Sequence, residues 1–305
     1  MRDGYRTVTA RAIQRRALLA SVAMLAAVAA LAATSTTHAG TRAGVTCRFE
    51  IATHRLTVTF HNDDANGGIL RRAGRLVVED VFGPIGCAGT ADPTRFNTDR
   101  VRVRASAADV DDLEFEIDLT AGPFAPGFSD EGDGSSEIEF SIPFPAGSGS
   151  RVPIHGRWGP NRVLLGHLPH RQGANLNAAE DVDDPDVTIR GGTFFVYGGG
   201  RADVISARGG GGGFIGPYLK RVVALGAPGD DLLSGGPKRD YLIGGGGHDT
   251  MKGDGGSDFL VARDHTRDVV RCGRGRDFAK VDRVDQVRRC EDVFTEGRWP
   301  PGLRE

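Results

Sequence analysis

A nine-residue repeat between Gly226 and Val261 constrains the fold of this chain more than any other feature. Four units follow one another without a gap, and each begins with glycine, carries aspartate at position six and has an apolar residue at position eight. The aspartates are Asp231, Asp240, Asp249 and Asp258, and the apolar residues are Leu233, Leu242, Met251 and Leu260. A disordered Gly/Asp-rich linker needs no such register, so the repeat predicts a regular, stacked structure.

Each unit reads as a tight turn followed by a short strand. Glycines in the first half allow positive φ, and the last three residues are extended, with position eight facing opposite to its neighbours. Two units, or eighteen residues, would complete one coil of a parallel β-roll. This places Asp231 above Asp249 and Asp240 above Asp258, whereas position five, for example Asp230, is expected to face solvent.

Stacked carboxylates predict a bound cation, because they repel one another unless positive charge lies between them. Carboxylates and backbone carbonyls are the hard oxygen ligands that Ca²⁺ accepts in irregular geometry. One apolar residue in nine also makes a thin core, so metal binding is expected to be part of folding. We therefore expect residues 198–261 to be disordered without calcium and to form β-structure with it.

The repeat resembles the RTX (haemolysin-type) calcium-binding nonapeptide repeat family, whose pattern is G-G-x-G-x-D-x-U-x. The resemblance covers about residues 198–285 and implies a right-handed β-roll that holds Ca²⁺ between stacked turns, on position-six carboxylates and turn carbonyls. The ligands that it implies are Asp231, Asp240, Asp249 and Asp258, with Asp203 from an isolated unit, and the turn glycines Gly229, Gly247 and Gly256. Lys238 and Arg239 replace smaller residues in the second turn, which is expected to hold metal less well.

Residues 1–39 have the pattern of a secretory signal peptide. Five arginines and one aspartate precede an apolar run from Ala17 to Ala33, and Thr37-His38-Ala39 suits cleavage before Gly40. The run is slightly short for a membrane anchor and no second one follows, so no span is expected after cleavage. Because this segment carries +4 of a total net charge of −2, the mature chain carries −6, which argues against nucleic acid as a partner.

The four cysteines are Cys47, Cys87, Cys272 and Cys290. Export favours disulfides, and four cysteines allow three pairings. The sequence-local pairing, Cys47–Cys87 and Cys272–Cys290, would close each end of the mature chain, and it is the pairing that we predict.

The rest of the chain is expected to be all-β, because no segment has a convincing helical period. Residues 40–90 form a disulfide-bonded β-unit and residues 91–197 a β-rich region, for which a β-solenoid with irregular coils and a β-sandwich both remain open. A solenoid is favoured because a coil end offers a template on which the repeats can continue. Residues 198–261 form the β-roll with a looped-out insertion at 207–225, and residues 262–305, where the pattern decays, form a C-terminal cap.

The expected function is calcium binding by a secreted bacterial protein with a structural or adhesive role outside the cell. Calcium ions are the expected partner, with cell-surface or extracellular polysaccharide as a candidate. No catalytic activity is expected, since the chain has neither a G-x-S-x-G nor an H-E-x-x-H motif. The alternative is a calcium-dependent polysaccharide lyase on the solenoid, for which the acidic loop at 180–186 and Arg190 would suit a polyuronate.

Overall fold

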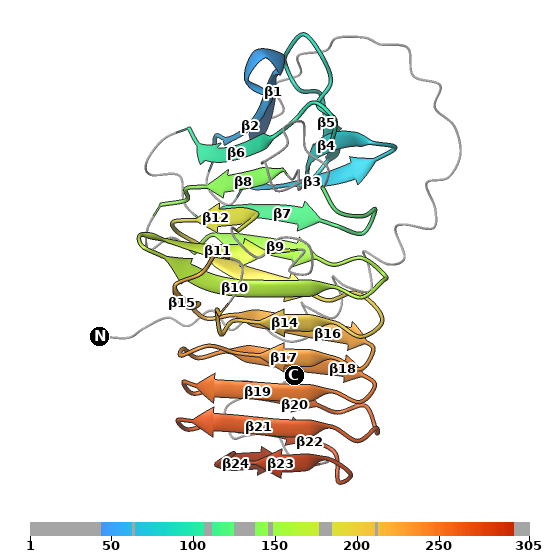
Figure 1. Ribbon diagram of the computed structural model, residues 1–305, viewed down its shortest axis with the longest axis vertical. Coiled ribbons are helices and arrows are strands. Elements are labelled where there is room, and N and C mark those ends of the chain that lie inside the picture. Colours follow the sequence, from blue (N-terminus) through green and yellow to red (C-terminus); the bar gives the residue numbers. More distant parts are fainter. Residues whose placement is uncertain are drawn as a thin grey trace. The chain divides into compact units, whose positions relative to one another are not determined.

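A computed structural model describes residues 44–62, 65–106, 112–124, 138–145, 149–176, 185–210 and 213–295 of the chain. All of them belong to one compact unit, residues 39–295. The predicted signal peptide, most of the acidic loop at 180–186 and the end of the cap at 296–305 lie outside the described residues. In the described ranges the chain is all-β apart from one 3₁₀ turn, Ile51–Thr53 (Figure 1), and no helix there is long and apolar enough to cross a membrane.

The strands belong to two sheets, which we call sheet A and sheet B. Sheet A has the order β1 (Val45–Glu50), β2 (Arg55–Phe60), β6 (Arg100–Ala105), β8 (Glu139–Ile142), β12 (Val187–Ile189), β11 (Arg171–Asn175), β10 (Arg162–Leu168), β14 (Val204–Ser206), β17 (Leu232–Ser234), β19 (Thr250–Gly255), β21 (Val269–Arg274) and β23 (Gln286–Arg288), with β15 (Gly216–Pro217) beside β10. Sheet B has the order β24 (Asp292–Phe294), β22 (Phe278–Val281), β20 (Phe259–Ala262), β18 (Tyr241–Gly246), β16 (Val223–Pro228), β13 (Thr193–Tyr197), β9 (Arg151–His155), β7 (Glu114–Asp118), β3 (Asn66–Arg72), β4 (Arg75–Asp80) and β5 (Gly83–Ile85).

The chain passes between the two sheets and adds parallel strands to each, so it forms a solenoid. In the repeats, Leu233 is in register with Met251, and Leu242 with Leu260, which confirms a coil of two units and eighteen residues. Parallel pairing also joins β2 to β6 and β6 to β8 in sheet A, and β3 to β7 and β7 to β9 in sheet B. The N-terminal region is therefore a solenoid rather than a sandwich, with antiparallel hairpins such as β1–β2, β3–β4 and β10–β11 added to it.

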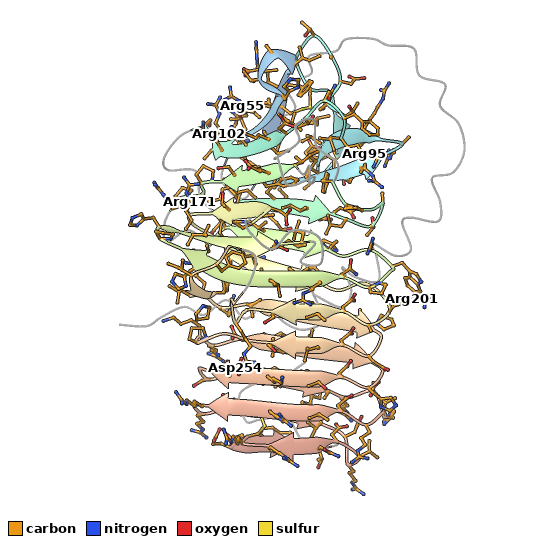
Figure 2. The ribbon with its side chains drawn as sticks, in the orientation of Figure 1. Arg55, Arg95, Arg102, Arg171, Arg201 and Asp254 are labelled. Atoms are coloured by element: carbon orange, nitrogen blue, oxygen red, sulfur yellow. A yellow bond between two sulfur atoms is a disulfide. The ribbon has the colours of Figure 1, made fainter. Side chains whose placement is uncertain are left out.

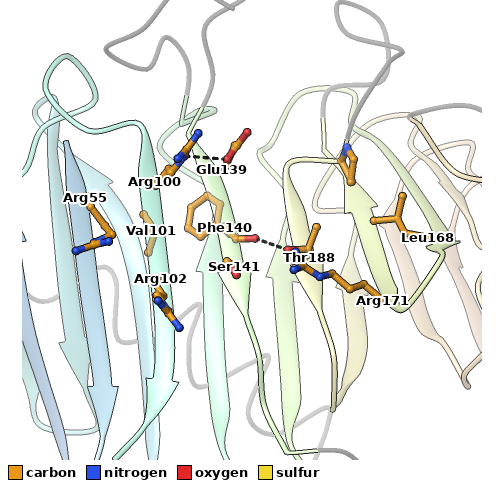
Figure 3. A pocket seen from close by; sticks show the side chains of 11 residues that line it. Arg55, Arg100, Val101, Arg102, Glu139, Phe140, Ser141, Leu168, Arg171 and Thr188 are labelled. Carbon is orange, nitrogen blue, oxygen red and sulfur yellow. Dashed lines mark hydrogen bonds and ion pairs between the residues drawn. The ribbon is translucent and has the colours of Figure 1, made fainter. Parts of the chain in front are cut away.

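Strand alternation separates the core from the surface (Figure 2). In β6, Val101 and Val103 are fully buried, whereas Arg100, Arg102 and Arg104 are exposed. Two of these arginines line a pocket on the outer face of sheet A (Figure 3). The pattern predicts this division, because successive side chains of a strand point to opposite faces.

The core changes in character along the solenoid. The N-terminal coils contain buried aromatic side chains, and Phe60 packs edge-on against Phe115 and Phe144 with ring centroids 6.3 and 6.2 Å apart. In the four tandem units, the position-eight side chains are fully buried: Leu233, Leu242, Met251 and Leu260. The repeats thus have the thin aliphatic core that their sequence predicts.

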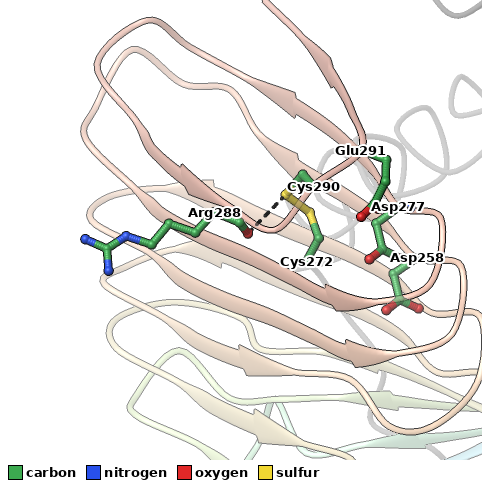
Figure 4. Close-up of a disulfide and its surroundings, with 6 residues drawn as sticks. All are labelled: Asp258, Cys272, Asp277, Arg288, Cys290 and Glu291. Atoms are coloured by element: carbon green, nitrogen blue, oxygen red, sulfur yellow. Dashed lines mark hydrogen bonds between the residues drawn. A yellow bond between two sulfur atoms is a disulfide. The ribbon is translucent and has the colours of Figure 1, made fainter.

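Both disulfides join the predicted pairs. Cys47 and Cys87 have Cα atoms 4.6 Å apart, and those of Cys272 and Cys290 are 5.0 Å apart (Figure 4). Cys272 lies in β21 and is fully buried, and the second bridge ties it to the chain after β23. The last coils are thereby covalently closed.

The insertion predicted at 207–225 is shorter than expected, and the prediction that all of it is looped out is wrong. Val223–Pro228 forms β16, which pairs in parallel with β13 and β18. The Val222 N–H donates to Asp240 Oδ1, so residues 217–225 are a further unit with Val222 at position six. Tyr218 in this unit is fully buried, and its hydroxyl accepts the Phe194 N–H at 3.2 Å. Only residues 207–216 are inserted, and the degenerate unit escaped recognition because neither Gly nor Asp marks it.

Candidate metal centre

The aspartates at position six form two ladders along the solenoid. In each ladder, the Oδ1 atom of one aspartate accepts the backbone N–H of the residue at the same position one coil earlier. The first ladder contains Asp203, Asp231, Asp249, Asp268 and Asp285, linked by hydrogen bonds of 2.7 to 3.0 Å. The second contains Val222, Asp240, Asp258 and Asp277, linked at 2.8 Å, and ends on Glu291 (Figure 4). This confirms that Asp231 stacks on Asp249, and Asp240 on Asp258.

The ladders extend beyond the region in which the repeat is recognisable. Asp268 and Asp277 are fully buried and continue the two ladders nineteen residues after Asp249 and Asp258. The sequence suggested a decayed pattern here, because the distance from one unit to the next is irregular. Counting from one coil to the next reveals that the ladders continue, because this distance stays at eighteen or nineteen residues.

Most ladder aspartates have a second carboxylate oxygen that is buried and has no hydrogen-bond donor in the described part of the chain. These Oδ2 atoms belong to Asp203, Asp231, Asp249, Asp258, Asp268 and Asp277. A buried charge without a partner is strongly destabilising. Each of these carboxyl groups is therefore expected either to carry a proton or to bind a cation.

The Oδ2 atoms of Asp203, Asp231, Asp249 and Asp258 lie against the glycine at position one of their own unit, and those of Asp203, Asp231 and Asp258 also lie beside the carbonyl of the first residue one coil later. A Cβ atom at Gly226 would overlap Asp231 Oδ2 and lie 2.5 Å from the Gly244 oxygen. A Cβ atom at Gly253 would lie 2.5 Å from Asp258 Oδ2 and would overlap the Cys272 oxygen. We call each of these places a turn pocket. At these turns only glycine fits at position one, because a side chain would collide with the carboxylate or the carbonyl, and these oxygens are ligands of the kind that Ca²⁺ prefers.

Asp240 differs from the other ladder aspartates. Its Oδ2 atom accepts the Gly236 N–H at 2.6 Å, while its Oδ1 atom accepts the Val222 N–H. Both oxygens are therefore engaged within the protein. This gives a geometric reason, beside the presence of Lys238 and Arg239, to expect weaker metal binding at the second turn.

The glycines at position four have a conformational role. Gly229, Gly247 and Gly256 have φ values of +155°, +130° and +130°, and a Cβ on Gly247 would overlap the Gly229 carbonyl oxygen of the coil before. The Gly247 carbonyl accepts the Thr266 hydroxyl at 2.5 Å. Within the described ranges, no three His, Cys, Asp or Glu side chains converge as a metal cluster. A bound ion would therefore depend on one or two carboxylates together with backbone carbonyls.

Burial raises the pKa of the ladder carboxyl groups, because desolvation disfavours the charged form. The pKa rises from 3.8 to about 6 for Asp231 and Asp240, to about 7 for Asp249 and Asp268, and to about 8 for Asp258. Hydrogen bonds from the backbone partly oppose this rise, and the neighbouring carboxylates of each ladder add to it.

We expect the metal-free protein to lose stability as the pH rises from 5 to 8. In the unfolded chain these aspartates titrate near pH 4, so above that pH the folded state binds more protons, and its advantage is lost through the interval of the raised pKa values. Urea unfolding of metal-free protein at pH 5 and pH 8, followed by circular dichroism, measures the change. A midpoint that is higher at pH 8 would contradict buried, unpaired carboxyl groups.

The N-terminal coils contain a pair of ionisable residues, Glu116 and His155, that the sequence analysis does not predict. His155 Nε2 lies 3.6 Å from Glu116 Oε1, and the imidazole stacks on Tyr197 with centroids 4.4 Å apart. Burial raises the pKa of Glu116 to about 7 and lowers the pKa of His155. The pairing arises from the register of β7, β9 and β13, which alternation within a single strand does not predict.

Comparison with known proteins agrees with the geometry of the turns. Residues 225–260 match the family model of the RTX calcium-binding nonapeptide repeat in four copies. These copies coincide with the four tandem units, so this segment is an RTX repeat region that forms a β-roll. Nothing matches the chain among curated proteins or among solved structures.

Proposed function

We propose that this protein is a secreted, non-catalytic calcium-binding solenoid with a structural or adhesive role outside the cell. The observation that carries the proposal is the row of buried carboxylate oxygens without donors, inside a segment that matches a calcium-binding repeat. The residues that would hold the ions are Asp231, Asp249 and Asp258, then Asp203, Asp268 and Asp277, with Asp240 contributing less, together with carbonyls such as those of Gly244 and Cys272. Bound calcium supplies the positive charge that these carboxylates lack.

Calcium binding and folding of the roll are expected to be coupled. Each unit buries one apolar side chain but also a carboxylate, and adjacent carboxylates in a ladder repel each other. The unfolded chain does not hold these oxygens together, so binding free energy becomes folding free energy. The N-terminal coils have an aromatic core and do not depend on this contribution.

The test is calcium titration of the full mature protein after metal removal. Circular dichroism is expected to show a gain of β-structure from residues 198–261 on addition of millimolar calcium, and calorimetry is expected to show saturable binding. Identical spectra in chelator and in calcium would contradict the proposal. Magnesium at the same concentration is the control, because it demands a more regular octahedral site than turn carbonyls and carboxylates offer.

Export is supported by the pattern of residues 1–39 and by the two disulfides, since disulfides persist mainly in oxidising compartments. For the lyase alternative, residues 180–184 of the acidic loop lie outside the described residues and Arg190 is exposed. The Glu116–His155 pair is the observation that favours catalysis, because a carboxyl group that titrates near neutrality suits proton transfer. A turnover assay on polygalacturonate, with and without calcium, separates the two functions, and release of unsaturated products would establish the enzyme.

A further inference from the structure

A pocket of about 540 Å³ lies on the outer face of sheet A, away from the repeats. Its wall contains four arginines from three strands, namely Arg55 of β2, Arg100 and Arg102 of β6, and Arg171 of β11 (Figures 2 and 3). Glu139 is the single acidic residue in the wall, so the pocket carries a net charge of +3. Neither this pocket nor its arginines have a part in the turn pockets.

The register of the strands builds the pocket in two rows. Arg100 pairs with Arg55 on one side and with Glu139 on the other, which makes a charged row. Arg102 pairs with Ser141, and Ser141 with Thr188, which makes a second row with two hydroxyl groups, on β8 and β12. Gly173, the next residue in this row, has no side chain, and the Phe214 and Pro185 side chains cover it. Ser141 and Thr188 thus form a small floor between arginines that approach from β6 and from β11 (Figure 3).

The four arginines differ in how far their charge is already compensated. Arg55 lies 2.7 Å from Glu50, and Arg100 lies 3.3 Å from Glu139. Arg102 and Arg171 are exposed and have no ion pair with an acidic side chain of the described residues. A guanidinium group recognises carboxylate, sulfate and phosphate through paired hydrogen bonds. Two such groups are therefore free to bind anions on either side of a hydroxyl floor.

The spacing favours a chain of anionic groups over a single ion. The strands that carry Arg102 and Arg171 are separated by β8 and β12, so they lie three strand spacings apart, roughly 14 Å. The Ser141 hydroxyl can donate to and accept from sugar hydroxyls in between, and the Thr188 hydroxyl, which donates to the Phe140 carbonyl at 3.4 Å, can accept from them. The one aromatic residue of the wall, Phe140, is buried, so the pocket offers no platform on which a nucleobase could stack.

We propose that this pocket binds an acidic polysaccharide, with Arg102 and Arg171 contacting anionic groups on separate sugar residues. The shared chemistry is a carboxylate or sulfate group displayed on a polyhydroxylated chain. The assignment does not depend on calcium binding by the repeats, because every residue that it uses lies in the N-terminal coils.

The double variant Arg102→Gln/Arg171→Gln is expected to bind short oligogalacturonides or dextran sulfate more weakly by about tenfold or more. Its matched control is Arg271→Gln/Arg288→Gln, which removes the same charge from exposed, paired positions on the same sheet at its other end. The control is expected to change binding by less than about twofold, because exposed charges without a specific contact contribute little. Comparing the two ligands shows whether the pocket prefers carboxylate or sulfate.

Full-length mature protein and fluorescence anisotropy of labelled oligosaccharide provide the measurement, with neutral dextran and single-stranded DNA as further ligands. Equal loss in both double variants would show non-specific attraction and overturn the proposal. Absence of binding to both acidic polymers would also overturn it, as would DNA binding of equal strength. Calcium titration of the pocket variant is expected to match that of the wild type, which keeps this test separate from that of the proposed function.

Discussion

Asp249→Asn is expected to weaken calcium binding at its site about a hundredfold, because it removes a charge-assisted ligand from a buried pocket. Asparagine has the shape of aspartate and keeps Oδ1, which accepts the Asp231 N–H at 2.9 Å. It replaces the Oδ2 atom, which has no donor in the described structure, by an NH₂ group. The hydrogen bonds of the ladder should therefore remain while the calcium ligand is lost, and calorimetric titration measures the change in calcium affinity.

The same substitution is expected to have the opposite effect on the metal-free protein. Burial raises the pKa of Asp249 to about 7, so its charge opposes folding at neutral pH. A neutral amide removes this cost. In chelator at neutral pH, circular dichroism should therefore show more β-structure in the variant than in the wild type, whereas urea unfolding of calcium-loaded protein should show a less stable variant. If Asp249 had only a structural role, the substitution would destabilise the roll both in chelator and in calcium.

Asp230→Asn is the matched control for the loss of charge. Asp230 is exposed, as expected for position five, but its Oδ1 atom also accepts the His248 N–H at 2.8 Å. It therefore does not simply face solvent, and alanine at this position would remove a hydrogen bond that asparagine retains. We expect Asp230→Asn to leave the affinity within a few-fold, as for an exposed charge. Equal titration curves for the two variants would show that the register assigned to the turns is wrong.

The periodic part of the protein was predictable because one local rule repeats. Gly at position one, Asp at position six and an apolar residue at position eight define the coil, and both disulfides followed from their place in the sequence. The orientation of the carboxylates was not predictable. A sequence shows that Asp231 and Asp249 stack, but not that one oxygen bonds to the backbone while the other remains free.

Features that depend on pairing between distant strands also escaped the sequence. Arg55, Arg102 and Arg171 belong to segments more than forty residues apart, and only the order β2–β6–β8–β12–β11 brings them to one pocket. The unit at 217–225 has Val222 in place of aspartate, and only its pairing with β18 reveals it. Local alternation predicts that such side chains face outward or inward, but not which neighbours they meet.

Gly226→Ala is expected to prevent metal binding at its turn pocket and to destabilise the roll by about 1–3 kcal/mol, as overpacking does. Its φ is not positive, so alanine is compatible with the backbone, and the effect is steric. The added methyl group would overlap Asp231 Oδ2 and lie 2.5 Å from the Gly244 carbonyl oxygen. Neither group can move freely, because Asp231 Oδ1 accepts the Asp203 N–H and Gly244 lies in β18. Unlike Asp249→Asn, this variant should gain no β-structure in chelator, and it should be less stable than the wild type in calcium.

Gly255→Ala tests whether the effect belongs to the turn pocket or to glycine in the roll generally. Gly255 lies in β19, its φ is not positive, and the nearest atom to an added Cβ would be the Pro237 Cα at 3.8 Å. We expect its stability to lie within about 0.5 kcal/mol of the wild type or slightly above it, since alanine restricts the unfolded chain. Urea unfolding and calcium titration of both variants provide the comparison. If Gly255→Ala lost as much stability and calcium affinity as Gly226→Ala, the space beside Asp231 Oδ2 would have no special role in binding metal.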